Sequence, residues 1–172
     1  MIIVGVDPSI TCTGVASRGW SDRVLSPSRH MSGKTELANQ LERMAKICRD
    51  VSRLAALADL VVIEGPAYAK STANTHKLAG LWWLVASELS RSSRLLVVAP
   101  TKLKRFAAGT GNADKGAMRD ALVRRMPEYE PKDDNETDAI WLAALGYHLA
   151  GDPLCTLPEH NIEALNGLSI EL

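Results

Sequence analysis

Acidic residues stand at the borders of the apolar segments of this chain, where they contribute least to folding. Asp7 closes the first apolar run and Glu64 closes a later one, while Asp134 and Asp138 open a third. A carboxylate at the end of a buried strand is costly, because burial removes its hydration. Mg²⁺ prefers oxygen ligands in fixed geometry. Three or four carboxylates on rigid elements can hold two such ions, an arrangement that clamps the attacking and leaving oxygens of a phosphodiester.

The distribution of apolar residues predicts an α/β fold in one main domain. Strands are expected at residues 2–6, 11–16, 23–25, 60–64 and 95–98, and helices at 35–55, 74–90, 101–107, 114–126 and 134–149. Apolar residues recur every three or four positions in the first helix, and the later strands are continuously apolar, as inside a parallel sheet. This order indicates a layered α/β architecture. Residues 1–150 are expected to form the domain, and 151–172 a loosely packed C-terminal tail.

Composition and charge narrow the class of protein. With 172 residues, of which 46% are hydrophobic, the chain can bury a single core, and none of its apolar stretches reaches membrane-spanning length. Three cysteines without metal-ligand spacing, and a start without signal-peptide character, favour a reduced cytoplasmic protein. The formal net charge is zero. A nucleic-acid partner would therefore require the basic residues to be segregated on one face.

Four segments of the chain share the order and spacing of one family's motifs. They read GVDPSITCTG at 5–14, VIE at 62–64, PTKLK at 100–104 followed by GTGNADK at 109–115, and NETDA at 135–139. Together they resemble the RuvC family of Holliday-junction resolvases, within the RNase H-like superfamily. Each motif alone is a weak signal, but four motifs in order are specific. The resemblance implies an RNase H-like mixed sheet flanked by helices.

The resemblance also implies a function. The expected activity is that of a metal-dependent, structure-selective DNA endonuclease that resolves Holliday (four-way) junctions by paired phosphodiester hydrolysis. Two Mg²⁺ ions per active site are expected, with Mn²⁺ as an alternative; one activates the attacking water and the other stabilises the leaving 3′ oxygen. A two-fold symmetric substrate favours a homodimer. The expected partners are branched DNA and a second copy of the chain, with no membrane, in a bacterial cell or one infected by phage.

The resemblance assigns metal binding and catalysis to particular carboxylates. Asp7 is expected to bridge both ions, and Glu64 and Asp138 to complete their coordination. The chain departs from the family pattern at Ser9, where glycine is usual, and at Asn135, where a further acid is common.

Helical geometry suggests where the fourth carboxylate lies. Positions three and four residues before Asp138 share its helix face, whereas Glu136, two residues before it, points away. Asp134 is therefore expected to be the fourth catalytic metal ligand. The alternative is that Asp133 or Asp134 only caps the helix.

Basic residues near these motifs are expected to bind DNA phosphates. Lys104 and Lys115 lie in the matching segments and are expected to contact phosphate or to act in catalysis. The further predicted DNA-binding residues are Tyr68, Lys70, Lys77, Lys102, Arg105 and Arg119. Tyr68 either packs within the fold or wedges against a base. Because the acids alone would repel DNA, these cations are expected to form a basic rim around a metal-loaded centre.

Alternatives remain at the levels of function and of structure. The chain could instead be a nuclease for other branched DNA, or a non-catalytic junction-binding protein, which the amide at Asn135 would favour. The tryptophan-bearing helix at 74–90 either packs entirely in the core or presents Trp83 to a second copy.

Overall fold

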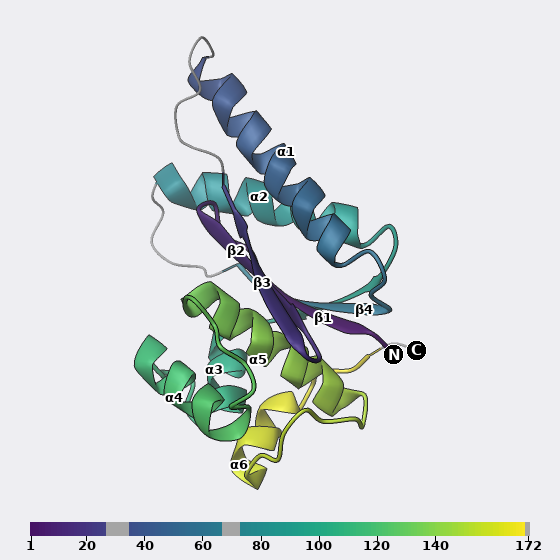
Figure 1. The fold of residues 1–172 in the computed structure, drawn as a ribbon, viewed down its shortest axis with the longest axis vertical. Helices are drawn as coiled ribbons and strands as arrows, with labels where there is room; N and C mark the ends of the chain where they lie inside the picture. Colours follow the sequence, from purple (N-terminus) through teal and green to yellow (C-terminus); the bar gives the residue numbers. More distant parts are fainter. Residues whose placement is uncertain (27–34, 67–72, 171–172) are drawn as a thin grey trace.

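Within residues 1–26, 35–66 and 73–170, which the computed structural model describes, a five-stranded mixed sheet lies between helical layers (Figure 1). The elements are β1 (Ile3–Asp7), β2 (Cys12–Ser17), β3 (Trp20–Leu25), α1 (Glu36–Leu54), β4 (Leu60–Glu64), α2 (Ala73–Leu89), β5 (Arg94–Val98), α3 (Pro100–Ala108), α4 (Lys115–Arg125), α5 (Asp134–Leu149), α6 (Glu159–Ile162) and the 3₁₀ turn η1 (Glu163–Leu165). The predicted α/β class is confirmed. In this described part of the chain, no helix is long and apolar enough to cross a bilayer.

The strand pairing brings the ends of β1 and β4 together. The sheet order is β3-β2-β1-β4-β5, with β1 antiparallel to β2 and parallel to β4. Val6 is the register partner of Ile63, so the next residues, Asp7 and Glu64, lie side by side as the last residues of their strands. Two acids that are far apart in the sequence therefore meet at the carboxyl ends of two inner strands of the sheet.

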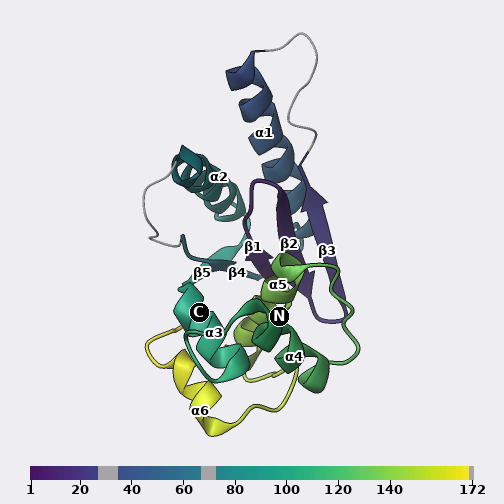
Figure 2. The same ribbon diagram turned by 90° about the vertical axis from the view of Figure 1, so that its left-hand side faces the viewer.

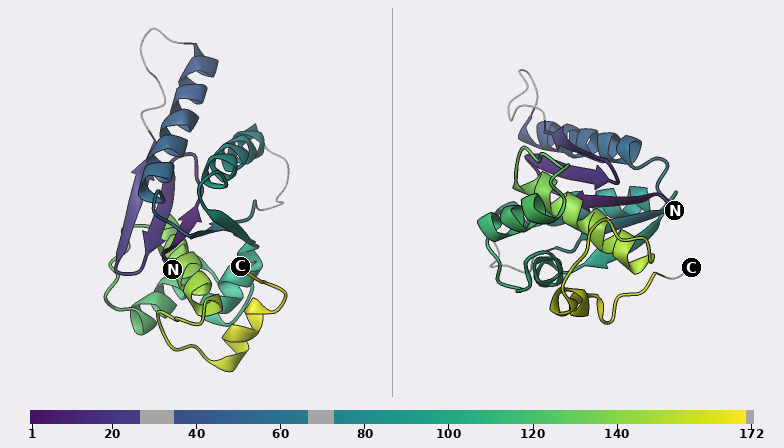
Figure 3. Two further views of the ribbon diagram at one scale, coloured as in Figure 1. Left: turned by 90° about the vertical axis from the view of Figure 1, so that its right-hand side faces the viewer. Right: turned by 60° about the horizontal axis from the view of Figure 1, so that its bottom comes forward.

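The two faces of the sheet carry separate cores. Alternate residues of a strand point to opposite faces: Val4 and Val6 join the core under α1 and α2, whereas Ile3 joins the core under α5. Figures 2 and 3 show α1 and α2 on one side of the sheet and α3, α4, α5 and α6 on the other. Of the helices on that second side, α5 packs directly on β1, β2 and β4. It therefore delivers its side chains to the strand ends.

Glycines allow α5 to lie unusually close to the central strands. A Cβ atom added at Gly5 would lie 2.1 Å from the Ala139 carbonyl oxygen, and one at Gly14 would lie 2.0 Å from that of Asn135. Both contacts are with helix backbone, which cannot rotate away as a side chain can. The first turns of α5 thus rest on the bare backbone of β1 and β2, which fixes their height above the sheet.

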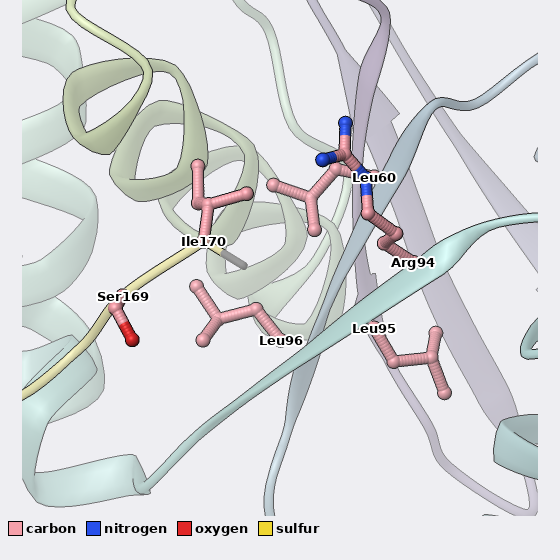
Figure 4. Close-up of a pocket in the computed structure, with 6 residues that line it drawn as sticks. All are labelled: Leu60, Arg94, Leu95, Leu96, Ser169 and Ile170. Atoms are coloured by element: carbon pink, nitrogen blue, oxygen red, sulfur yellow. The ribbon is translucent and has the colours of Figure 1, made fainter. Parts of the chain in front are cut away.

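The C-terminal segment is packed more closely than the sequence predicted. Leu157, Asn161 and Ala164 are buried, and the Asn161 side-chain amide donates to the Phe106 carbonyl near the end of α3, at 2.7 Å. An open cavity of about 410 Å³ lies between this segment and the start of β4 and β5. The residues that line it are drawn in Figure 4: Leu60, Arg94, Leu95, Leu96, Ser169 and Ile170. Scattered single contacts hold the segment, so no periodic pattern in the sequence marked it as ordered.

Candidate active site

Three carboxylates meet where β1, β4 and α5 come together. Asp7 ends β1 and Glu64 ends the parallel neighbour β4, while Asp138 lies in the second turn of the helix that crosses them. Asp7 is only 7% exposed, and its carboxyl group is hydrogen-bonded to that of Glu64. The structure therefore brings together the three acids that the sequence analysis singled out.

Burial raises the pKa of each of these carboxyls, and repulsion between like charges raises it further for Asp7 and Asp138. Burial raises the pKa of Asp7 well above its ordinary value, and the charges of Glu64 and Asp138 raise it further. Burial also raises the pKa of Glu64, against the hydrogen bond with Asp7 and the charge of Lys104. The pKa of Asp138 rises to about 7, first through burial and then through repulsion by Glu64 and Asp134. The site thus holds negative charge that nearby cations compensate only in part.

A cavity of about 240 Å³ opens beside the acids. It is lined by Glu64, Pro100, Lys104, Asp114, Lys115, Met118, Asp134, Thr137 and Asp138. Lys115 Nζ lies 2.6 Å from Asp134 Oδ2, and this hydrogen bond raises the pKa of the lysine. The charge of Lys104 opposes the rise in pKa of Asp138. Both predicted catalytic lysines therefore share a cavity with the acids.

The start of α5 determines which acid reaches the cavity. Asp133 is the N-cap, since its Oδ1 accepts a hydrogen bond from the Glu136 amide at 2.9 Å. Asn135 turns away and donates its side-chain amide to the Cys12 carbonyl. Among residues 133–136, all of which the structure describes, only Asp134 lines the cavity. The capping alternative therefore holds for Asp133 and not for Asp134.

Two of the predicted DNA-binding residues instead contact the C-terminal segment. Lys102 Nζ donates to the Asn166 carbonyl at 2.5 Å, and Arg105 Nη2 donates to Glu163 Oε2 at 3.0 Å. These residues border a separate cavity of about 480 Å³. No local sequence pattern indicates these contacts, because they join parts of the chain that are far apart.

Of the remaining predicted DNA-binding residues, the structure describes Lys77 and Arg119, which make separate contacts within the protein. Lys77 Nζ lies 3.7 Å from Glu36 Oε1, in the helical layer on the other side of the sheet. Arg119 Nη2 donates to the Pro131 carbonyl at 3.5 Å. Tyr68 and Lys70 lie outside the described residues.

Two polar residues of the cavity wall were not predicted. Asp114 caps α4, accepting a hydrogen bond from the Ala117 amide at 2.8 Å. Thr137 Oγ1 donates to the Asp133 carbonyl at 3.0 Å. An acid directly before a helix is a recognisable capping signal, so Asp114 could have been found from the sequence. Thr137 carries no such local signal.

The donors of the site fit a hard divalent cation, because they are carboxylate oxygens. In the positions they occupy, no group of three or more His, Cys, Asp or Glu side chains from the described ranges is close enough to hold a metal ion. In this arrangement Asp134 pairs with Lys115, and Glu64 and Asp138 carry charges that repel each other. A divalent cation would compensate this charge and allow the carboxylates to approach one another.

Known proteins similar to this chain are junction nucleases. No protein-family model matches the chain. Crossover junction endodeoxyribonuclease RuvC of Synechococcus sp. strain WH7803 is 30% identical over 156 residues, covering 86% of this chain and 98% of that protein. Its counterpart from strain RCC307 is 30% identical over 155 residues, covering 81% and 94%. The Cytophaga hutchinsonii protein of that name is 26% identical over 161 residues, covering 88% and 78%.

Solved structures show the same fold. Thermus thermophilus RuvC superposes with a TM-score of 0.61 at 17% sequence identity, covering 91% of this chain and all of that one. The same protein in complex with a Holliday junction substrate gives a TM-score of 0.66, also at 17% identity, with 90% of this chain covered. The predicted RNase H-like mixed sheet flanked by helices is thereby confirmed.

Replacing Asp138 by Asn is expected to stabilise the metal-free protein. The pKa of Asp138 is raised from 3.8 to about 7, so its contribution to stability is lost as pH rises through 7. In EDTA at about pH 8.5, the variant should melt at least about 4 °C higher than the wild type, since about 1 kcal/mol moves Tm by 2–4 °C in a chain of this size. The difference should shrink as pH falls towards about 4.

The matched control is Asp120→Asn, at an exposed position on α4, which should leave the melting temperature unchanged. Differential scanning calorimetry across this pH range makes the measurement. An Asp138→Asn protein that melts below the wild type at high pH would contradict the electrostatic description of the site.

Proposed function

The chain belongs to the RuvC family of crossover junction endodeoxyribonucleases, and from this membership we propose that it resolves four-way DNA junctions by metal-dependent cleavage. One observation carries the proposal: Asp7 and Glu64 end adjacent parallel strands, and both face Asp138 on α5. The names of the relatives and the junction-bound structure of one similar protein support it. The product would be two nicked duplexes with 5′-phosphate ends.

Four carboxylates would hold two Mg²⁺ ions, with Mn²⁺ as an alternative: Asp7, Glu64, Asp138 and Asp134. When bound, the ions supply the positive charge that stabilises the attacking and leaving oxygens during phosphodiester hydrolysis. Asp7 is the most buried of these four acids and senses the charges of Glu64 and Asp138, which supports the proposal that it would bridge the ions. The choice of Asp134 as the fourth ligand is supported by its place in the cavity lining, whereas the side chain of Asn135 is hydrogen-bonded to the Cys12 carbonyl.

The lysines of the cavity would bind and orient the phosphate. Lys104 lies near enough to Glu64 and Asp138 to act on their pKa values, so its ammonium group can contact a phosphate held at these acids. Lys115 is 79% exposed in its side chain and is free to move from Asp134 to an incoming DNA strand. Neutralising phosphate charge in this way favours binding of any DNA, and the shape of the cleft would then select branched DNA.

A wider set of residues is proposed to form the DNA-binding rim. It comprises Tyr68, Lys70, Lys77, Lys102, Arg105 and Arg119. Lys102 and Arg105 would exchange the carbonyl of Asn166 and the carboxylate of Glu163 for phosphate oxygens. Because the Arg105–Glu163 pair is half exposed, such an exchange costs little.

Asp7→Asn is expected to abolish cleavage while preserving junction binding. The substitution removes one ligand charge without changing the size of the side chain, and the cleavage rate should fall by at least about 100-fold, the upper range for loss of a supporting metal-site group. Asp134→Asn should also reduce cleavage, and by more than Asn135→Ala. A 5′-labelled synthetic junction with Mg²⁺, and a flap substrate beside it, measures both rate and substrate preference.

Asp120→Asn is the charge-matched control and should cut at the wild-type rate. If the wild-type protein cleaves flaps in preference to junctions, its substrate is flap DNA and the four-way junction is the wrong assignment. A wild-type protein that binds junctions but never cuts them would identify a non-catalytic junction-binding protein. If Asn135→Ala proves more harmful than Asp134→Asn, the fourth ligand has been misassigned.

Lys115→Met is expected to tighten metal binding and to slow cleavage. In the metal-free protein Lys115 forms an ion pair with Asp134, and a metal ion that binds Asp134 must displace the lysine. An exposed ion pair contributes up to about 1 kcal/mol, so the Mg²⁺ concentration that gives half-maximal thermal stabilisation should fall roughly two- to five-fold. Cleavage should slow because a phosphate contact is lost. Lys46→Met, which removes the Lys46–Asp50 pair on α1, is the control and should change neither property.

The outer face of α2 is proposed to form a homodimer. Trp83 is 68% exposed and Leu84 is 42% exposed, while Leu81 and Val85 on the inner face are buried. The alternative that the whole helix lies in the core is therefore wrong for Trp83. Trp82 packs edge-to-face on Trp83 at 5.0 Å between ring centroids, and its Nε1 donates to the Glu64 carbonyl at 2.7 Å. A dimer through this face would place two active sites in a two-fold arrangement matching the junction.

Trp83→Glu is expected to give a folded monomer that nicks one strand at a time. A charge at the centre of an apolar contact opposes association, and since the side chain is exposed the fold should survive. Leu57→Glu, at a residue that is 80% exposed outside α2, is the control and should remain dimeric. Sedimentation velocity and a paired-cut assay make the measurement. A Trp83→Glu protein that still sediments as a dimer and makes paired cuts would exclude this interface.

A further inference from the structure

A buried carboxylate lies beneath the first turn of α5, outside the active-site cavity. Glu136 is 1% exposed, although it belongs to the same turn as Asp134. Its Oε1 accepts from Ser21 Oγ at 2.7 Å, and its Oε2 accepts from the Lys132 amide at 2.8 Å. Arg23 Nε lies 3.9 Å from the same Oε2. Two hydrogen bonds and a nearby guanidinium group therefore compensate the buried carboxylate of Glu136 within the protein.

The same cluster includes the helix cap. Arg23 Nη1 donates to Asp133 Oδ2 at 3.1 Å, while Asp133 Oδ1 accepts the amide of Glu136. Ser21 and Arg23 belong to β3, so this network ties the edge strand of the sheet to the beginning of α5. Next to it, Gly14 of β2 contacts the Asn135 carbonyl. One turn of helix is therefore held by side chains and by direct backbone contact.

A buried ion cluster is a poor source of stability. Removing a carboxylate from water is costly, and well-packed apolar residues of similar volume commonly stabilise a fold as well or better. What such a cluster supplies is a single preferred geometry, because its hydrogen bonds are satisfied in only one arrangement. Helix ends otherwise tend to fray. The network therefore holds the first turn of α5 at one rotation about its axis.

That rotation determines where two proposed metal ligands point. Asp134 and Asp138 are four residues apart and share one face of α5, while Glu136 between them points to a different face. The other two ligands, Asp7 and Glu64, belong to the sheet itself. Metal sites need their ligands held to within about 0.5 Å. A small rotation of the start of α5 about its axis would move Asp134 in the first turn, and with it Asp138 in the second, away from Asp7 and Glu64.

We propose that Glu136, with Ser21 and Arg23, is a positioning residue of the nuclease site that sets the rotation of the first turn of α5. The inference rests on the proposed function for its consequence in cleavage, and on the described contacts for its effect on the helix. Glu136 itself is not a proposed metal ligand and does not line the cavity.

Glu136→Ala tests the proposal, with Glu136→Gln as the conservative variant. Glutamine can keep both hydrogen bonds, because Ser21 can rotate to accept, so only the charge facing Arg23 is lost. Glu136→Ala should lower the single-turnover cleavage rate about 10- to 100-fold, the range for loss of a supporting group, and raise the Mg²⁺ concentration needed for thermal stabilisation. Junction affinity in EDTA should stay within about two-fold of wild type. Glu136→Gln should recover most of the rate.

Ser21→Ala removes one hydrogen bond with little change in volume, and it provides the test if Glu136→Ala does not fold. Ile47→Val, in the separate core under α1, is the control for a general loss of stability. It should lower the melting temperature without changing the Mg²⁺ midpoint or the cleavage rate. If the two Glu136 variants and Ile47→Val behave alike at equal stability, Glu136 is only structural and the proposal is overturned.

Hydrogen exchange makes the result independent of the proposed function. In metal-free protein, amides 136–139 should exchange at least about ten-fold faster in Glu136→Ala than in wild type, while the amides of α1 are unchanged. Equal protection in the two proteins would overturn the positioning role even if junctions are cut. If amides exchange faster in Glu136→Ala but the wild-type protein cuts no junction, the positioning role is supported and the proposed function is overturned.

Discussion

The contact between α5 and the bare backbone of β1 and β2 is the constraint on which the rest of the structure depends. Gly5 and Gly14 leave no side chain between strand and helix, so the carbonyls of Ala139 and Asn135 lie where a Cβ would otherwise be. Any other residue at these positions would lift the helix by the thickness of a methyl group. The helix carries half of the proposed ligands and the sheet carries the other half. Their separation is therefore set by the absence of two side chains.

Charge in the site is balanced against its function. Asp7 is buried and Glu64 and Asp138 are half-buried beside it, all with raised pKa values, which is unfavourable for folding and, under the proposed function, would favour binding of a divalent cation. The positive charges of Lys104 and Lys115, which line the cavity, offset part of the repulsion between these carboxylates. Sites that hold such repulsion persist where the surrounding fold is strong enough to keep it. Here two independent cores, one on each face of the sheet, provide that support.

The sequence predicted what depends on local pattern, and missed what depends on distant contacts. Apolar periodicity located the strands and helices, and helical spacing selected Asp134 over Glu136 as the acid facing the cavity. The engagement of Lys102 by Asn166 joins residues 64 positions apart, and the burial of Glu136 under Ser21 joins residues 115 positions apart. No local pattern encodes such pairs. The C-terminal segment was expected to be loose for the same reason, because single residues such as Asn161 anchor it rather than a periodic face.

The parallel pairing of β1 with β4 has a consequence for how the protein comes into being. Asp7 and Glu64 become neighbours only after the connection that contains β2, β3 and α1 has folded back onto the sheet, and Asp138 joins them only when α5 has docked. Contacts of such long sequence separation close late in folding. A growing or half-folded chain therefore contains the acids but no cutting centre. For an enzyme that breaks DNA strands, this topology means that cleavage activity is absent until the fold is complete.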